Sequence, residues 1–509
     1  MTTTVNKKQI AKNALYLYVR TFFVIVLMLV ASRVLLRALG AEDFGLYNLV
    51  GSIVAMFTSL RVVFASATQR FLNYEKSHNN VQILSNIFVI SKRLHWGLSI
   101  FFLIITECLG IWALNDYLVI PDGRLPDAYI ALQCSIFSAI AMLLTVPYDA
   151  VIISNERFNA YAYLAILECA LQLGAAYAVI IIPENKLVWY SIMVLVAALL
   201  VRFINMIYCR FAFEECRHKG KFDKVLFKDM AKFAGWNFLG NFALSIYNEG
   251  INMVLNIFGG VLANAARAVS TQVLKGIGSI SDRMSTAFAP QATQQYALGD
   301  MNRFHDLIFL ATKLINYLYI FIAIPIAIFA PLVLDIWLDD VPQYSVEFVR
   351  AILVYGLARS IHSPLDLCFK CYGKLKRYQI IEICCLLPAL PMAYIMLHCG
   401  LPLYWALLAM AITNLINDIA IIILAHREWG FRAKEFIIKA LVPILSIICI
   451  SMILSRLVLW CIDNIIVQII LIIAICFAVI IFIGVSKDER KYIKSFIYKR
   501  IPINTTNNA

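Results

Sequence analysis

The sequence predicts an all-α polytopic membrane protein with about fourteen transmembrane helices. Of its 509 residues, 62% are hydrophobic and only 15% are charged, and the mean hydropathy is +0.80. Soluble domains usually hold about 45–50% apolar and about 25% charged residues. Runs of about 20 apolar residues, which is long enough to cross a bilayer, occur fourteen times. These observations exclude a soluble globular protein.

The predicted spans follow one another with short loops between them. They lie at residues 14–36, 44–65, 94–114, 128–153, 160–182, 187–209, 233–258, 261–288, 307–334, 345–369, 378–398, 402–424, 437–460 and 464–485. The eighth span is the least apolar. We retain it because the neighbouring spans require the chain to cross the membrane once at this point. The N-terminus is basic and lacks a small-x-small cleavage site, so we interpret the first span as retained rather than as a signal peptide.

Lysine and arginine are concentrated in alternate loops. The N-terminus, the loops after even-numbered spans and the C-terminal tail hold 30 of the 44 basic residues. The loops after odd-numbered spans hold only Arg37, Arg124 and Lys186. Because basic loops stay on the cytoplasmic side, both termini are predicted to be cytoplasmic. The net charge of +13 therefore reflects the basic loops that set the membrane topology, and these loops attract anionic membrane lipid. Nucleic acid is not a predicted partner.

No pattern in the sequence indicates an enzyme. Most of the thirteen cysteines lie in apolar runs, and the lone CxxC of Cys368 and Cys371 is better explained by packing than by a metal. There is no Gly-rich phosphate loop, HExxH or GxSxG, so we expect no catalytic residue, cofactor or metal. The longest predicted outer loop, 115–127, leaves no room for the extracytoplasmic domain expected of a glycan polymerase or ligase.

Three landmarks recur about 220 residues apart. In each copy a glycine lies 28 residues after a lysine, at Gly40 and at Gly260. The next span ends in a glutamine, and an arginine lies eight residues before it, at Arg61 and at Arg283. The third landmark is a proline, an aspartate and a tyrosine with the same spacing in both copies: Pro147, Asp149 and Tyr161, then Pro364, Asp366 and Tyr378. The offsets between the copies are 220, 222 and 217 residues for the three landmarks in turn.

These landmarks indicate an internal repeat of six spans. Because six is even, both copies insert in the same orientation, with a pseudo-twofold axis along the membrane normal and a cavity between the halves as the natural substrate site. The repeat predicts Arg61 and Arg283 at equivalent depths on facing bundles. The predicted domains are an N-terminal six-helix bundle, a C-terminal six-helix bundle, an additional transmembrane pair and a cytoplasmic tail: 1–215, 216–430, 431–485 and 486–509.

Eleven basic residues lie inside or at the edges of predicted spans. A basic residue at the bilayer centre costs about 2.5–3.5 kcal/mol, so several of these must line a hydrated cavity or pair with acids. We predict a cationic, substrate-binding cavity made by the deeper and intermediate residues Arg61, Arg283, Lys275, Arg33 and Arg267. Residues near span ends are expected to reach for lipid headgroups instead: Arg20, Arg202, Lys313, Arg350 and Arg456.

Acidic residues are fewer in the spans, and the first span has none. We predict ion coupling or salt bridges for Glu249, Asp149 and Asp366, with Glu249 the strongest candidate for ion coupling because it lies deep in its span. The excess of cations implies an anionic substrate. A guanidinium group suits a pyrophosphate well, because it offers two parallel hydrogen bonds to phosphate oxygens.

Several stretches resemble the O-antigen and polysaccharide flippases (Wzx type) of the MOP (multidrug/oligosaccharidyl-lipid/polysaccharide) exporter superfamily. The stretches are LLRALGAEDFGLYNLVGSIVAMF and SATQRF within 35–71, PYDAVIISNERFNAYAYLAILE at 147–168 and AFAPQATQQYALGD at 287–300. The resemblance extends over about residues 8–430. It implies a MATE-like fold of two pseudo-symmetric six-helix bundles, to which the last helix pair is appended.

The resemblance also implies a function. A protein of this kind moves undecaprenyl-diphosphate-linked oligosaccharide units of O-antigen, capsule or exopolysaccharide across the bacterial inner membrane by alternating access. The cavity arginines would hold the diphosphate, and polysaccharide polymerase machinery would be a partner. Two alternatives stay open: a flippase for the peptidoglycan precursor lipid II, and a multidrug exporter of the same fold. The exporters often use an acid in the first span, which this chain lacks.

Overall fold

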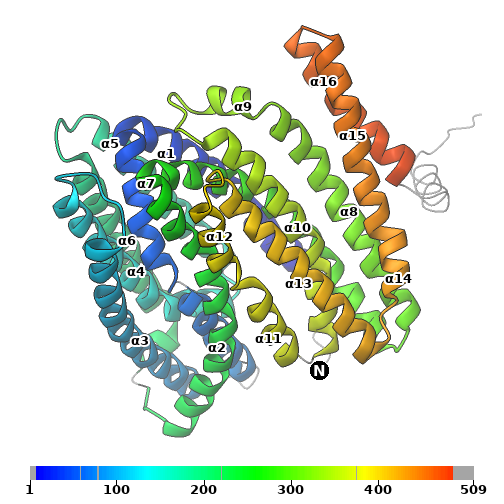
Figure 1. The fold of residues 1–509 in the computed structure, drawn as a ribbon. Coiled ribbons are helices and arrows are strands. Elements are labelled where there is room, and N and C mark those ends of the chain that lie inside the picture. Colours follow the sequence, from blue (N-terminus) through cyan, green and yellow to red (C-terminus); the bar gives the residue numbers. More distant parts are fainter. Residues whose placement is uncertain (1–6, 58, 77–79, 219, 374, 485–509) are drawn as a thin grey trace, which may run out of the picture. The chain divides into compact units, whose positions relative to one another are not determined.

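The computed structural model describes residues 7–57, 59–76, 80–218, 220–373 and 375–484, and in these ranges every regular element is a helix (Figure 1). The predicted all-α fold class is therefore confirmed. The predicted cytoplasmic tail, 486–509, lies outside the described residues.

The first half of the chain supplies six helices and one turn of 3₁₀-helix. They are α1 (Lys7–Ala55), α2 (Ser59–Lys76), α3 (Val81–Asp116), α4 (Leu125–Ser154), α5 (Phe158–Ile180), α6 (Lys186–Ala212) and η1 (Glu214–Cys216). Asn80 caps α3, since its side chain accepts hydrogen bonds from the backbone N–H groups of Gln82 and Ile83. Helix α4 begins with a proline in its first turn, where a missing N–H costs nothing.

The second half of the chain also consists of helices joined by short loops. Its helices are α7 (Lys224–Ala297), α8 (Met301–Ile328), α9 (Ala330–Trp337), α10 (Ser345–Tyr372), α11 (Leu375–Leu386), α12 (Ala389–His398) and α13 (Trp405–Trp429). The side chain of Asp300 caps α8 by accepting a hydrogen bond from the backbone N–H of Arg303.

The chain continues into an appended hairpin. It consists of α14 (Ala433–Phe436), the π-helix η2 (Ile437–Leu441), α15 (Val442–Cys461), α16 (Ile465–Val479) and the π-helix η3 (Ile480–Gly484). Helices α15 and α16 pack against each other and against α8 (Figure 1). The hydroxyl of Tyr317 on α8 donates a 2.9 Å hydrogen bond to the carbonyl oxygen of Gly484.

Eleven helices in the described ranges are long and apolar enough to cross a membrane. The chain is therefore a multi-pass membrane protein. Two of the eleven, α1 and α7, are bent at a glycine: α7 holds two predicted spans, and α1 holds the first span and the start of the second, which continues onto α2. One further predicted span falls on α10, which carries five charged residues. Each of the fourteen predicted spans thus lies on helical segments.

The two bends lie at the glycines that the repeat predicted to form turns. Gly40 has φ 76° and ψ 171° inside α1, and Gly260 has φ 60° and ψ −163° inside α7. These angles are almost restricted to glycine, because a side chain would be strained there. At each bend the chain leaves one span and enters the next without a separate loop.

A second glycine of the LGAEDFG stretch allows a close helix contact. A Cβ atom built on Gly45 would lie 1.9 Å from the carbonyl oxygen of Val261 on α7. Only glycine lets the two backbones approach this closely, which is the usual role of small residues where membrane helices meet. The start of the second span in one repeat thus contacts the equivalent part of the other.

The chain divides into two compact units. Unit 1 holds Met1–Val273, Pro331–Ile352 and Ile383–Thr413, and unit 2 holds Leu274–Ala330, Leu353–Glu382 and Asn414–Ala509. The predicted boundary between residues 215 and 216 stays a prediction.

Each unit has its own apolar core. In unit 1 the core joins α1, α3 and α4, where the small residues Ala128 and Ala131 of α4 meet Leu46 and Leu49 of α1. In unit 2 the core is rich in aromatic side chains from α8, α10 and α14 and from the segment before α14: Phe304, Phe309, Phe369, Tyr372, Phe431 and Phe436. These two cores hold in place the helices that carry the charged residues described next.

Candidate functional site

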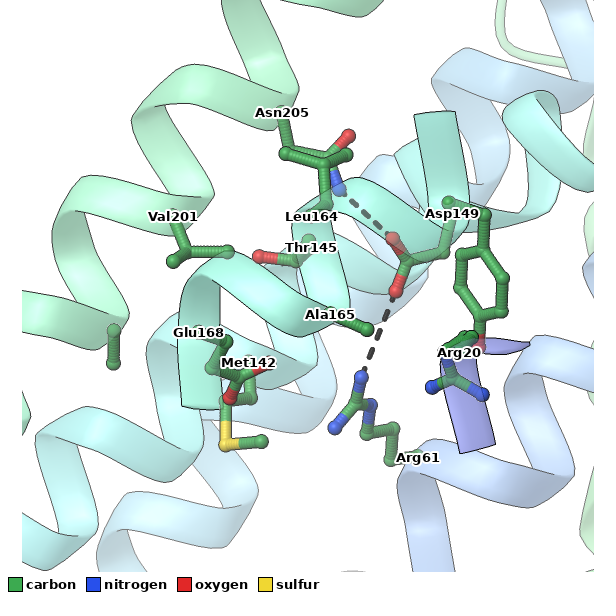
Figure 2. Close-up of a pocket in the computed structure, with 12 residues that line it drawn as sticks. Arg20, Arg61, Met142, Thr145, Asp149, Leu164, Ala165, Glu168, Val201 and Asn205 are labelled. Carbon is green, nitrogen blue, oxygen red and sulfur yellow. Dashed lines mark hydrogen bonds and ion pairs between the residues drawn. The ribbon is translucent and has the colours of Figure 1, made fainter. Parts of the chain in front are cut away.

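A polar pocket lies among five helices of unit 1. It is partly open, with about 470 Å³ of non-protein space that includes solvent, and is lined from α1, α2, α4, α5 and α6 (Figure 2). Its charged and hydrogen-bonding residues are Arg20, Arg61, Asp149, Tyr161, Glu168 and Asn205. Two of them, Asp149 and Tyr161, are landmarks of the internal repeat, and Arg61 is the deep arginine that the sequence singled out.

Arg61 and Asp149 form an ion pair across the pocket. The Nη2 atom of Arg61 lies 3.6 Å from Oδ2 of Asp149, and the Nδ2 atom of Asn205 donates a 2.8 Å hydrogen bond to Oδ1 of the same carboxylate (Figure 2). Both oxygens of Asp149 are thus engaged. The Arg61 side chain is 35% exposed and that of Asp149 17%, so the pair is open on the arginine side.

Arg20 is the second cation of the pocket. Its guanidinium lies 4.6 Å from the centre of the Tyr161 ring, which is a cation–π contact. Its Nε atom is buried and has no hydrogen-bond partner among the described residues. The sequence placed Arg20 among the residues that reach for headgroups, but the structure places it in the pocket beside Arg61 (Figure 2).

Glu168 on α5 completes the charge balance. It lines the same pocket and is partly buried, so two guanidinium groups face two carboxylates. Each guanidinium carries five N–H donors in a planar fork, and one ion pair at 3.6 Å leaves most of them able to bind another acceptor. Arg61 can therefore release the carboxylate of Asp149 and bind another anionic group in its place.

Arg33 lies elsewhere, at the far end of the first half of α1. Its Nη2 atom donates a 2.7 Å hydrogen bond to Oδ1 of Asp339, and Nη1 of Arg37 lies 3.6 Å from the other oxygen. The hydrogen bond from Arg33 lowers the pKa of Asp339, which is in the loop between α9 and α10. Nearby, Nε1 of Trp337 donates to the carbonyl oxygen of Leu29 at 3.1 Å.

The remaining predicted cavity cations are dispersed in the fold. Arg267 is buried, with 5% exposure, and its Nη2 atom lies 3.6 Å from the sulfur of Met410. Lys275 is exposed. The side chain of Arg283 lies outside the described residues, so its predicted position opposite Arg61 stays a prediction. Of the four predicted residues whose side chains the structure describes, Arg61 alone lines the pocket of unit 1.

The three predicted acids have different surroundings. Asp149 is the partner of Arg61. Asp366 lies 2.7 Å from Nζ of Lys370 and accepts a 3.1 Å hydrogen bond from the hydroxyl of Tyr378. Glu249 is partly buried and lies 3.4 Å from Nδ2 of Asn252. Nothing in these contacts tests an ion-coupling role.

Comparison with known proteins adds a local match to a family model and a fold. Residues 238–395 match the MatE family. No curated protein matches the sequence. Three solved structures are similar at low sequence identity, and such similarity is informative about the fold alone.

The lipid II flippase MurJ, in an inward closed conformation, is 15% identical, with a TM-score of 0.72, and the match covers 94% of this chain and all of that one. A multidrug resistance MATE family transporter of the MOP superfamily, in an inward-facing conformation, is 16% identical, with a TM-score of 0.67, covering 81% and 95%. A MOP superfamily transporter from Pyrococcus furiosus is 15% identical, with a TM-score of 0.57, covering 82% and 95%.

The MurJ match reaches into the appended hairpin. A match to 94% of 509 residues cannot be confined to the first 430, because these are only about 84% of the chain. The MATE match at 81% does not require the hairpin. Together with the MatE match, the similarity shows that this multi-pass chain has the fold of the MOP-superfamily transporters.

Proposed function

We propose that the protein is a flippase for undecaprenyl-diphosphate-linked oligosaccharides, which it moves by alternating access from the cytoplasmic to the periplasmic leaflet of the bacterial inner membrane. The observation that carries this proposal is the pair of arginines, Arg20 and Arg61, in a polar pocket inside a transporter fold. Arginine is the side chain best suited to a diphosphate, because its planar fork matches two phosphate oxygens. Both termini are cytoplasmic in this proposal.

The pocket supports reversible binding of an anionic headgroup. In its resting state Arg61 is paired with Asp149 at 3.6 Å, a contact too long for a strong hydrogen bond. An incoming diphosphate takes over the Arg61 guanidinium, while Asp149 keeps its hydrogen bond from Asn205. The unpartnered Nε of Arg20 supplies a second donor. Release follows when Asp149 takes Arg61 back.

A lipid II flippase is the second candidate. Its specific support is the MurJ structure, which matches 94% of this chain, including part of the hairpin. Lipid II also carries a polyprenyl diphosphate, so the same arginines would serve both substrates. A multidrug exporter has no observation of its own in its favour, because the carboxylates of Asp149 and Glu168 are balanced by the guanidinium groups of Arg20 and Arg61.

Binding of a short-chain probe tests the pocket. Farnesyl diphosphate should bind the purified protein, and R61Q and R20Q should each weaken binding by about tenfold or more, as expected when a hydrogen bond to a charged group is lost. R456Q is the matched control, since Arg456 is exposed on α15 far along the chain from the pocket. If R456Q weakens binding as much as R61Q, charge in general is responsible and the pocket is not the site.

Transport in proteoliposomes separates the two substrates. The wild type should flip an undecaprenyl-diphosphate oligosaccharide that lacks a peptide, and R61Q should not. Preferred transport of lipid II over the peptide-free glycan would favour the second candidate. Failure to flip either lipid would contradict the proposed function.

The repeat suggests that Arg283 assists Arg61. If both arginines hold one diphosphate, the double alanine variant should be little worse than either single variant, and Arg→Lys at either site should keep partial activity because the charge remains while the fork is lost. Strictly additive losses of farnesyl diphosphate binding would show that the two do not share a ligand.

A further inference from the structure

A buried histidine on α10 of unit 2 lies between acidic and phenolic groups of two other helices. The Nδ1 atom of His362 lies 2.8 Å from Oδ1 of Asp418 on α13. Its Nε2 atom lies 3.0 Å from the hydroxyl oxygen of Tyr378 and 3.4 Å from Oε1 of Glu382, both on α11. The exposed fractions of the His362, Asp418 and Glu382 side chains are 1%, 5% and 10%.

The hydrogen bonds set the number of protons on this ring. The Tyr378 hydroxyl donates its one proton to Asp366 at 3.1 Å, so its oxygen acts as an acceptor toward Nε2 of His362. The carboxylate of Asp418 is an acceptor at Nδ1. Both ring nitrogens therefore face acceptors, which only a doubly protonated imidazolium can satisfy. A neutral ring would leave one bare nitrogen against an oxygen lone pair.

Two further groups near His362 act against this state and weaken it only in part, because one is a second cation and the other is an amide donor at longer range. Arg359 on the same helix contributes a second cation, with Nη1 4.0 Å from Oε1 of Glu382. Asn417 on α13 makes a longer contact, with Nδ2 3.5 Å from Nδ1 of the ring. The Oδ2 atom of Asp418 is buried and has no hydrogen-bond partner among the described residues. The nearest place on Asp418 to receive the proton when the ring releases it is the Oδ1 atom, 2.8 Å from Nδ1.

We propose that His362 is a proton-binding site, that its second proton joins α10 to α11 and α13, and that loss of this proton loosens the three helices during transport. The proton passes from the imidazolium to Asp418 and then to water, which leaves a neutral ring. One N–H···O link to the neighbouring helices is lost in that step, together with the attraction between the ring and the two carboxylates. The transport part of this proposal rests on the proposed function, whereas the proton site does not.

Proton occupancy can be measured directly by NMR of ¹⁵N-histidine protein in lipid nanodiscs. The chain has seven histidines, and H362Q identifies the signal of interest by its loss. At about pH 7.5, one unit above the ordinary pKa of histidine, the wild type should retain an imidazolium signal that H362Q lacks. The exposed His218, whose ring contacts the Glu214 carbonyl oxygen, provides the matched control, and H218Q should leave the imidazolium signal in place.

Two conservative variants keep this test valid if H362Q folds poorly. D418N and E382Q each remove one carboxylate beside the ring and should each reduce the imidazolium signal at that pH, with the larger loss for D418N because its contact is shorter. A neutral His362 in the wild type at about pH 7.5, or a signal unchanged by both variants, would overturn the proton site.

The link to transport needs a second readout. In proteoliposomes that contain an undecaprenyl-diphosphate oligosaccharide, the flipping rate of the wild type should change with pH, whereas H362Q should lose that dependence and H218Q should keep it. Retained pH dependence in H362Q would overturn the coupling. If the wild type flips no such lipid, the proposed function fails, while the NMR titration still decides whether His362 holds the proton.

Discussion

Arg33 and Asp339 lie 306 residues apart in the sequence and are joined by a 2.7 Å hydrogen bond between Nη2 and Oδ1. With the 3.6 Å contact from Arg37 and the bond from Trp337 to Leu29, it ties α1 to the segment between α9 and α10. All of these residues belong to unit 1. The contact is therefore part of the fold of that unit, and it is open to titration because Asp339 lies outside the spans.

The first prediction is that this contact weakens in acid. The pKa of Asp339 is lowered in the folded protein, first by the hydrogen bond from Arg33. A lowered pKa means that the contribution to stability is present above the ordinary aspartate value and is lost as the pH falls through the folded value. The melting temperature of D339N should therefore lie below that of the wild type at neutral pH, and the two should converge in acid.

The neighbouring residue provides a control for that experiment. Asp340 is also exposed, and D340N should melt like the wild type at every pH. A difference between D339N and the wild type that persists well below pH of about 3 would contradict the assignment, because Asp339 of the wild type would then be protonated and uncharged, like the asparagine of the variant.

The second prediction concerns the competition for Arg61. In D149N the side chain keeps its size and can still bond to Asn205, but it no longer attracts the guanidinium. Farnesyl diphosphate should bind more tightly by about fivefold or less, the effect of a partly exposed ion pair, and glycan flipping should slow because release is impaired. D122N, in an exposed loop, is the control. Weaker binding by D149N would instead mean that Asp149 positions Arg61.

The third prediction tests the two helix bends. G40A and G260A force a side chain into backbone angles that almost only glycine adopts, so each should destabilise the protein by about 1–3 kcal/mol. Gly51 on α1 and Gly276 on α7 lie within regular helix with nothing within 4 Å of a built Cβ. Alanine at these positions should be neutral or stabilising. Equal melting temperatures for G40A and G51A would exclude the proposed strain.

The fourth prediction is the orientation of the chain in the membrane. In a cysteine-free background, single cysteines at Asp122 and Asn185 should react with an impermeant thiol reagent added to intact cells, and one at Lys221 should not. All three positions are exposed in the structure, so access is limited only by the side of the membrane. Labelling of Lys221 but not of Asp122 would reverse the topology.

The fold was largely predictable because the bilayer restricts the structures that a membrane-spanning chain can form. A span needs about 20 apolar residues, so composition alone predicted the all-helical fold and a span count close to the eleven membrane-length helices of the described residues. The repeat located both bends, since Gly40 and Gly260 occupy matching positions. What the sequence could not provide was the packing of spans into two compact units, because helices meet through contacts between residues far apart in the chain.

The site was predicted only in part, and one reason is a misjudged depth. Arg20 and Lys313 were expected near span ends, where basic side chains reach for headgroups. The helices that carry them begin earlier than the apolar runs, at Lys7 and Met301, so Arg20 lies in the pocket and Lys313 is buried. Hydropathy marks where the apolar stretch starts, which is not where the helix starts.

His362 was missed for a different reason. Its partners Asp418 and Glu382 lie 56 and 20 residues away in the sequence. No periodic pattern connects them, since they meet through the packing of three helices. A histidine inside a predicted span is the one local signal that could have drawn notice to this cluster.

The appended hairpin touches the rest of unit 2 mainly through α8, with the Tyr317–Gly484 hydrogen bond at its end. In water, removing such an element would expose a large apolar face at great cost. In a bilayer the vacated face of α8 would meet acyl chains, which are as apolar as the hairpin, so the loss is limited to packing and one hydrogen bond. The α15–α16 pair can thus be removed without rebuilding the core of unit 2, and a chain that ends after Leu441, which keeps the core residues of α14 and η2, should still assemble.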